Sequence, residues 1–256
     1  MKLVAKRNEV PDTAAWQARV DLAAAHRLAV MHNFNEGIFN HMTLAVPNTT
    51  DRFYLNPFGL YWSEVRASDF MEVAFKDAAI LEGNGIVEPT AYCIHAPLHE
   101  LGPKANCVIH THMPYASALT RLEDPRVLPI GQTELGFVNQ IAYDPEYNGL
   151  AHDRAEGERM ASLVGDKNIM FLSNHGVVTL GHNVAEAYNR LYYLERACQV
   201  QLFAMWTGRK LKHVPDETMK LLQAQTGTTY GGRKSYDLHF DALKRVLDRK
   251  DPDYKD

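Results

Sequence analysis

One short stretch constrains this chain more than any other, because it joins a buried strand to a pair of histidines. Residues 105–112 read Ala-Asn-Cys-Val-Ile-His-Thr-His, an apolar run of strand length that ends in His110 and His112. In an extended chain residues i and i+2 project from the same face, so these two imidazoles point together while Thr111 points away. The pattern predicts half of a metal site at the end of a strand.

A third imidazole is available at His175, which lies between two further apolar runs at 169–172 and 177–180. A tight turn between two strands would place it beside the first pair. Three imidazoles with an open position form a catalytic site for a divalent ion such as zinc, manganese, iron or cobalt. The alternative is that each histidine is a half-buried, hydrogen-bonded residue at a strand end, since the His-X-His pattern also arises by chance.

Four sequence motifs resemble those of the class II aldolase and adducin family. They are IHTHMP at 109–114, FLSNHGVVTLG at 171–181, LNPFGL at 55–60 and HAPLH at 95–99. The resemblance extends over most of the chain, from about residue 12 to residue 206. It implies that His110, His112 and His175 hold one divalent metal ion per chain, with zinc as the first expectation and manganese, iron or cobalt as alternatives. It also implies a homotetramer with sites at subunit interfaces.

The resemblance fails at the position of the catalytic base. The family's sugar-phosphate aldolases use a glutamate near the metal, and counting back from His95 places that position at Ala91. Another group must therefore replace it in an enzyme. Our first choice is Glu134, in the loop that follows the metal strand and its helix, because a nearby cation favours an ionised carboxylate and lyase chemistry needs a proton carrier. The alternative for Glu134 is a solvent-facing residue at a helix start, and Glu88 is a weaker candidate.

Two histidines are further candidates for catalysis. His41 and His95 are expected to relay a proton or to bind a substrate carboxylate, because imidazole titrates near neutral pH. A structural hydrogen-bonding role is the alternative for each of them. His99, one helical turn after His95, shares its face and is expected to pack.

The phosphate-binding groups of the family are mostly missing from this chain. Its serine pair falls on Pro89 and Thr90, and the Gly-Asn of its other phosphate loop falls on Asn40 and His41. Phosphate binding needs clustered amides, hydroxyls and positive charge, and only Gly59 and Thr90 remain as substrate-binding candidates. We therefore expect an unphosphorylated substrate.

Three residues of an irregular segment and one asparagine complete the candidate site. Tyr143, Asp144 and Tyr147 are expected at the mouth of the site, and the alternative is that they only anchor a loop. Asn174 is expected to support His175 by hydrogen bonding, since metal-bound imidazoles normally have such partners.

Composition excludes several classes of protein. Apolar residues make up 46% and charged residues 23% of the chain, the net charge is -4, and the 27 lysines and arginines are scattered, so no nucleic-acid partner is expected. Three cysteines at unrelated spacings indicate neither a disulfide framework nor a Cys-X-X-Cys site. No secretory signal or membrane span is visible, so we expect a soluble, cytoplasmic protein with a small-molecule substrate and no membrane partner.

Helical and strand-like patterns alternate irregularly along the chain. Together with the resemblance, this predicts an α/β fold, a three-layer αβα domain with a mixed, largely antiparallel central sheet. We expect one domain over 1–256 with a C-terminal helical extension at about 211–256. Helices are expected from a cap at 12 or 13 to about 34 and at 94–101, 114–122, 154–164, 184–206, 217–225 and 240–247, with strands at 41–46, 52–55, 70–75, 78–81, 105–112, 169–172 and 177–180, an irregular segment at 123–147 and a flexible one at 226–235.

These features favour one function and leave two alternatives. The first is a metal-dependent lyase that cleaves a C–C bond of an unphosphorylated hydroxy- or oxo-acid, by retro-aldol reaction or decarboxylation. The second is a non-catalytic adducin-like interaction module, which the missing carboxylate at Ala91 would suit. The third is a dehydratase or epimerase that uses the same metal. Retention of three converging imidazoles favours the first, because a purely structural protein has no need of them.

Overall fold

The computed structural model describes residues 13–102, 105–225 and 229–256. Its centre is an eight-stranded sheet with the order β4-β3-β2-β1-β5-β8-β7-β6, in which only the β6–β7 pair is parallel. The expected mixed, largely antiparallel sheet is confirmed. The strands are β1 His41–Ala45, β2 Arg52–Leu55, β3 Met71–Ala74, β4 Ile80–Glu82, β5 Cys107–Thr111, β6 Ile141–Asp144, β7 Ile169–Leu172 and β8 Val177–Gly181, and a separate hairpin joins β9 Thr229–Tyr230 to β10 Arg233–Lys234.

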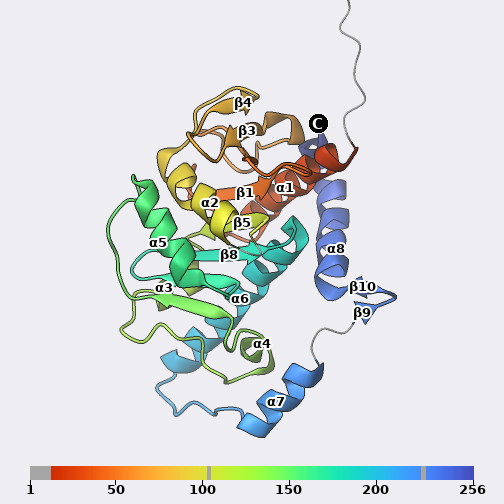
Figure 1. The fold of residues 1–256 in the computed structure, drawn as a ribbon. Helices are drawn as coiled ribbons and strands as arrows, with labels where there is room; N and C mark the ends of the chain where they lie inside the picture. Colours follow the sequence, from red (N-terminus) through yellow and green to blue (C-terminus); the bar gives the residue numbers. More distant parts are fainter. Residues whose placement is uncertain (1–12, 103–104, 226–228) are drawn as a thin grey trace, which may run out of the picture.

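Helices cover both faces of this sheet (Figure 1). On one face α2 packs against α5, and on the other α6 contacts α1, α3 and α8. The helices are α1 Thr13–Met31, α2 Pro89–Leu101, α3 Pro114–Leu119, α4 Gln132–Leu135, α5 Arg154–Val164, α6 Val184–Trp206, α7 Asp216–Gln225 and α8 Ser235–Lys250, with short 3₁₀ turns η1 Ala67–Asp69 and η2 Pro252–Lys255. Phe240 and Leu247 of α8 are buried in the same apolar cluster as α1 and α6.

The alternation of side chains along β5 decides which layer each residue enters. Cys107 and Ile109 lie in the apolar cluster that includes α1 and α6, whereas Val108 lies in the cluster formed with α2 and α5. His110 is two residues after Val108 and therefore points to the α2–α5 face. His41 is the direct cross-strand partner of His110 and points the same way. The histidines thus enter the layer between the sheet and α2.

Most expected elements are present, although several begin or end at other residues than expected. α1 stops at Met31 rather than near Phe34 because Asn33 adopts a left-handed φ of 60°, and a cap at Asp12 lies outside the described residues. α2 begins five residues earlier than expected, at Pro89, because the Glu88 carboxylate accepts a hydrogen bond from the Ala91 amide and proline suits a first helical turn.

The segment expected to be irregular contains a helix and a strand. Its apolar piece at 135–141 divides into the end of α4 and the start of β6, which pairs with β7. β6 is an edge strand held by its pairing with β7, so it depends on a contact between distant segments that the local pattern does not reveal. Within the described residues no helix is both long and apolar enough to cross a membrane.

Candidate active site

Two elements bring three imidazoles together. β5 delivers His110 and, one residue past its end, His112, while the turn between β7 and β8 carries His175. One nitrogen atom from each ring lies within 4.8 Å of the others. The ring centroids are 4.9 Å apart for His110 and His112, 4.9 Å for His110 and His175, and 4.8 Å for His112 and His175. The structure therefore assembles the predicted trio as a candidate metal centre.

Hydrogen bonds to groups outside the trio determine which ring nitrogen of His110 and of His112 faces the candidate metal centre. His110 Nδ1 lies 3.1 Å from the Val177 carbonyl, which can only accept, so this nitrogen carries the ring proton. His112 Nδ1 is bonded to the Glu36 carboxylate. The remaining nitrogens, Nε2 of His110 and Nε2 of His112, lie 3.2 Å apart with their lone pairs free. This is the arrangement that carboxylate and carbonyl partners impose on metal-binding imidazoles.

Electrostatics keeps the trio neutral. Burial, followed by the neighbouring imidazoles, holds the pKa of His110 well below its usual range and lowers that of His175 to about 4. Burial also lowers the pKa of His112, with partial opposition from Glu36. Neutral imidazole is the form that binds a cation, so the donors at neutral pH fit a divalent metal ion without proton loss.

The backbone around His175 is shaped to place its ring. Asn174 adopts a left-handed φ of 54°, and the His175 carbonyl accepts a hydrogen bond from Arg121 at 2.6 Å. A Cβ on Gly176 would stand 2.6 Å from a ring carbon of His112, so only glycine allows this approach. The expectation that the Asn174 side chain supports His175 is wrong, because its amide bonds Ser173 instead at 3.4 Å.

Glu36 is the residue of the candidate site that sequence reasoning missed. It lies in the Asn35-Glu36-Gly37 stretch that ends the first helical segment, and its carboxylate reaches the ring of His112, 76 residues later. A helix-end signal explains such a stretch completely. The only further signal would have been its place in space, because no spacing pattern links it to the histidines.

His41 and Glu88 form a second pair beside the trio. The ring of His41 stacks on that of His110 with centroids 5.7 Å apart, and its Nε2 lies 3.1 Å from Glu88 Oε2. Burial alone would raise the pKa of Glu88, but hydrogen bonds from His41, Thr90 and the Ala91 amide outweigh it and lower the pKa to about 2. Glu88 therefore remains a carboxylate, and His41 is fixed between it and a candidate metal ligand.

The position of the missing glutamate is occupied by Ala91, and the carboxylate of Glu88 lies next to it. Ala91 is fully buried in the first turns of α2, one helical turn before His95. Its amide donates to Glu88 at 2.6 Å. His95 is also fully buried, with its ring edge-on to His41 at 5.5 Å between centroids. Both histidines that the sequence singled out thus lie beside the trio.

The three residues expected to bind the substrate, Gly59, Thr90 and Tyr143, lie in different parts of the structure. Thr90 donates its hydroxyl to Glu88 at 2.6 Å, next to His41, and Gly59 lies in the loop after β2 with a φ of 106°. Tyr143 is not at the mouth: it lies in β6 opposite Phe171, packs on that ring at 5.4 Å and therefore points toward α6. Burial raises its pKa to about 12.

The neighbours of Tyr143 differ from one another. Asp144 is buried in an ion pair with Arg159 of α5 at 2.5 Å, so it anchors the helix. Tyr147 is half exposed, and its ring centroid lies 6.0 Å from that of His175. Tyr147 is therefore the tyrosine at the edge of the candidate metal centre.

Glu134 lies on the other side of the sheet. Its side chain is 3% exposed, with Oε1 unpartnered among the described residues, and it lines a cavity of about 600 Å³ together with Tyr192 and Arg196 of α6. α6 covers the face opposite to the one that His110 enters. Within one chain the structure does not bring Glu134 to the three imidazoles, because α4 packs on α6.

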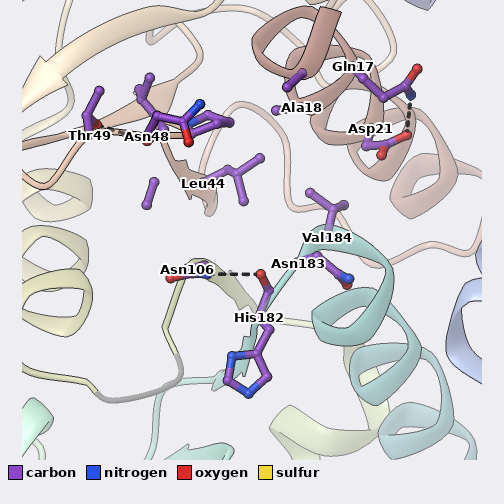
Figure 2. Close-up of a pocket in the computed structure, with 14 residues that line it drawn as sticks. Gln17, Ala18, Asp21, Leu44, Asn48, Thr49, Asn106, His182, Asn183 and Val184 are labelled. Carbon is purple, nitrogen blue, oxygen red and sulfur yellow. Dashed lines mark hydrogen bonds between the residues drawn. The ribbon is translucent and has the colours of Figure 1, made fainter. Parts of the chain in front are cut away.

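A separate hollow of about 440 Å³ lies at the far end of β5 from the trio, between α1 and the start of α6 (Figure 2). Asn106 lies at its border and donates a hydrogen bond to the His182 carbonyl at 3.2 Å. Asp21, Asn48 and Asn183 also line it. None of the three imidazoles is among its lining residues, so it is not part of the candidate metal centre.

The sequence of this chain matches a known protein family over most of its length. The model of the class II aldolase and adducin N-terminal domain matches residues 20–202. The chain belongs to the class II aldolase and adducin family. A crystal structure of an aldolase II superfamily protein from Pseudomonas syringae is 34% identical, with a TM-score of 0.87 over 95% of this chain and 97% of that one.

Two further relatives mark the range of the class II aldolase and adducin family. L-fuculose 1-phosphate aldolase from Glaciozyma antarctica shares the fold, with a TM-score of 0.81 over 94% of this chain and 93% of that one at 22% identity. Human (Homo sapiens) beta-adducin is 29% identical over 90% of this chain, which spans 33% of that protein. Family membership supports an aldolase-type lyase with a small-molecule substrate, and the trio suits the divalent metal ion on which class II aldolases generally depend.

Proposed function

We propose that this protein is a metal-dependent lyase that cleaves a C–C bond of an unphosphorylated hydroxy- or oxo-acid, by retro-aldol reaction or decarboxylation. The observation that carries the proposal is the pair of Nε2 atoms, 3.2 Å apart, whose rings are fixed by Val177 and Glu36. Such outer partners orient metal ligands and have no evident purpose in an inert module.

The metal would be held by His110, His112 and His175, with zinc as the first candidate and manganese, iron or cobalt as alternatives. When bound, the ion would supply a Lewis acid that polarises a substrate carbonyl and stabilises the negative charge left by C–C bond cleavage. Glu36 keeps the proton of His112 on Nδ1, and the Val177 carbonyl does the same for His110. Tyr147 borders the open side next to His175.

We assign proton transfer to His41, with Glu88 as its orienting carboxylate. Glu88 is anchored on the amide of Ala91, so its charge lies where the side chain of the missing base would begin. A carboxylate with a pKa of about 2 is a poor base, so we assign Glu88 the orienting role and not the proton transfer itself. Nε2 of His41 faces Glu88, so this is the nitrogen to which we assign proton transfer.

The absence of a phosphate group from the substrate is supported by what the corresponding residues do. Thr90 has its hydroxyl bonded to Glu88, and Asn40 accepts a hydrogen bond from the His112 amide at 3.0 Å. Pro89 has no amide hydrogen to offer. The groups that would surround a phosphate are thus engaged in holding the site together.

The test is turnover of a panel of 4-hydroxy-2-oxo acids by the zinc- and manganese-loaded protein, with separate detection of aldehyde, 2-oxo acid and carbon dioxide. We expect cleavage that the double substitution His110→Ala/His112→Ala abolishes, and no turnover of L-fuculose 1-phosphate. Fuculose phosphate cleavage at about 1 per second or faster, in the range of typical enzymes, would contradict the assignment of an unphosphorylated substrate.

The second candidate function is a non-catalytic interaction module. The similarity to beta-adducin and the alanine at position 91 favour it. It predicts that the purified protein contains no stoichiometric metal and that substitution of the trio leaves its partner binding intact. Elemental analysis of protein purified without a histidine tag separates the two functions directly. For the lyase we further expect a cytoplasmic homotetramer, which light scattering of the purified protein tests for mass.

A further inference from the structure

A chain of hydrogen bonds runs behind the candidate site, between β1 and α2. Thr43 Oγ1 lies 2.6 Å from His95 Nδ1 and 2.8 Å from His99 Nε2. His99 Nδ1 lies 2.5 Å from the carbonyl of Ala105. His95 and His99 are four residues apart on α2, so both rings emerge from one face of the helix and meet the hydroxyl of the strand.

The donor and acceptor in each of these hydrogen bonds follow from the Ala105 carbonyl at the end of the series. The Ala105 carbonyl only accepts, so His99 Nδ1 donates to it. Burial lowers the pKa of His99 to about 4, so at neutral pH this ring has one proton and its Nε2 accepts from Thr43. The Thr43 oxygen then accepts from His95 Nδ1. Because burial holds the pKa of His95 well below its usual range, its Nε2 is left as a bare lone pair.

That lone pair is oriented within a closed part of the molecule. His95 is 0% exposed, and its Nε2 has no hydrogen-bond partner among the described residues. Its ring stands edge-on to His41, whose Nδ1 is likewise buried and unpartnered within that part of the chain. The other nitrogen of His41 already faces Glu88 at 3.1 Å. A buried acceptor without a donor is costly, so the orientation of the His95 ring depends on its other nitrogen, which Thr43 binds.

We propose that Thr43 and His99 are positioning residues: they fix His95 as its Nδ1–H tautomer and hold its ring edge-on against that of His41. The groups that face His41 are then Glu88 from the start of α2, His95 from the same helix and His110 from β5. This deepens the proposed function, because it rests on the role of His41 in proton transfer.

The first measurement is the tautomer itself, by ¹⁵N–¹H correlation NMR of the full-length protein labelled at histidine, in zinc-loaded and metal-free form. His95→Gln assigns the signals of His95 by their loss. We expect Nδ1 of His95 to have the shift of a protonated nitrogen and Nε2 that of an unprotonated one. A proton found on Nε2 of His95 in both forms overturns the proposal, and this result does not depend on whether a substrate is known.

Substitution of Thr43 provides the second measurement. Thr43→Val keeps a β-branched side chain in the strand but removes the hydroxyl, so we expect His95 to become a mixture of tautomers. Thr43→Ser restores the hydroxyl and the single tautomer. An unchanged tautomer in Thr43→Val, or a mixture in Thr43→Ser, contradicts the proposal. The native protein and Thr43→Ser keep the test decisive if Thr43→Val does not fold.

Thr179→Val is the matched control. Thr179 is a fully buried threonine of β8 whose hydroxyl donates to the Ala187 carbonyl of α6, on the other face of the sheet. We expect this variant to leave the His95 signals unchanged. Once a substrate is found, Thr43→Val should lower kcat about 10-fold or more with little change in KM, as is usual for outer hydrogen-bonding partners. If the native protein turns over no substrate of the panel but His95 has the expected tautomer, the proposed lyase function is refuted and the positioning role of Thr43 and His99 is not.

Discussion

The two faces of the central sheet differ in how their buried polar groups are used. On the α6 face Glu195 accepts hydrogen bonds from two amides at the start of α3, and Gln201 binds the backbone at Leu128 and Arg126. These groups hold segments of chain. On the α2 face His41 and His95 stand edge-on to each other, and each has a buried ring nitrogen without a partner among the described residues, whereas the unpartnered Glu134 Oε1 of the α6 face lines a cavity. Groups that satisfy the backbone indicate structure, and groups with spare lone pairs beside each other indicate chemistry.

The largest expected effect is the loss of metal from the α2 face. The double substitution His110→Ala/His112→Ala removes two of three donors, so bound metal should fall from about one ion per chain to a background level. Elemental analysis after dialysis measures this, and circular dichroism checks that the fold is retained. Full metal content in the double variant would show that the trio is not the metal centre.

The next effect compares the two buried carboxylates. Glu88→Gln removes the charge that orients His41, so kcat should fall about 100-fold or more. Glu134→Gln, on the other face, should leave kcat within a few-fold of the native value. An equal loss in Glu134→Gln would mean that this carboxylate reaches the trio from a neighbouring subunit. Kinetics of both variants with the same substrate and metal decides between these outcomes.

A smaller loss is expected at the turn that carries His175. Gly176→Ala places a methyl group 2.6 Å from both the His112 ring and the Thr111 carbonyl, so a ring or the turn must shift. Metal affinity should fall about 10- to 100-fold, the range for residues that orient metal ligands. Gly136→Ala, whose nearest contact is 3.2 Å from the Thr133 carbonyl near α6, is the control and should bind metal normally. Competition with a chelator measures both affinities.

The last effect concerns stability rather than metal binding or turnover, and it involves a histidine of the α1 layer. His26 is fully buried, and burial lowers its pKa to about 4. The unfolded chain therefore binds a proton that the folded chain does not between about pH 6.5 and pH 4, so stability is complete above that window and decreases as pH falls through it. The contribution of this one residue is about 3 kcal/mol across the window.

Comparison of the native protein with His26→Gln isolates that contribution. The variant should lose part of the pH dependence of the free energy of unfolding, measured by urea denaturation between pH 7 and pH 4.5. An unchanged pH slope would show that His26 titrates normally in the folded protein. The remaining slope includes His32 beside α6 as well as His95, His99 and His110 of the α2 face, whose pKa values are lowered in the same direction.

The sequence by itself determined the features that depend on neighbours in the chain. The spacing of His110 and His112 fixes their common direction, and the apolar runs on either side of His175 define a turn. Both are consequences of the two-residue period of a strand. The departures at Ala91 and Pro89 were equally visible, because they are identities at aligned positions. The mixed sheet followed from the irregular order of strands and helices.

Only the tertiary structure decided which distant residues meet. Glu36 reaches His112 across 76 residues, and Thr43 meets His95 across 52. Periodicity states which face of its own element a residue occupies but not which element docks on that face, since docking depends on the packing of the whole core. For the same reason Glu134 could be identified as a carboxylate near the metal strand in sequence, while the packing of α4 on α6 placed it behind the sheet.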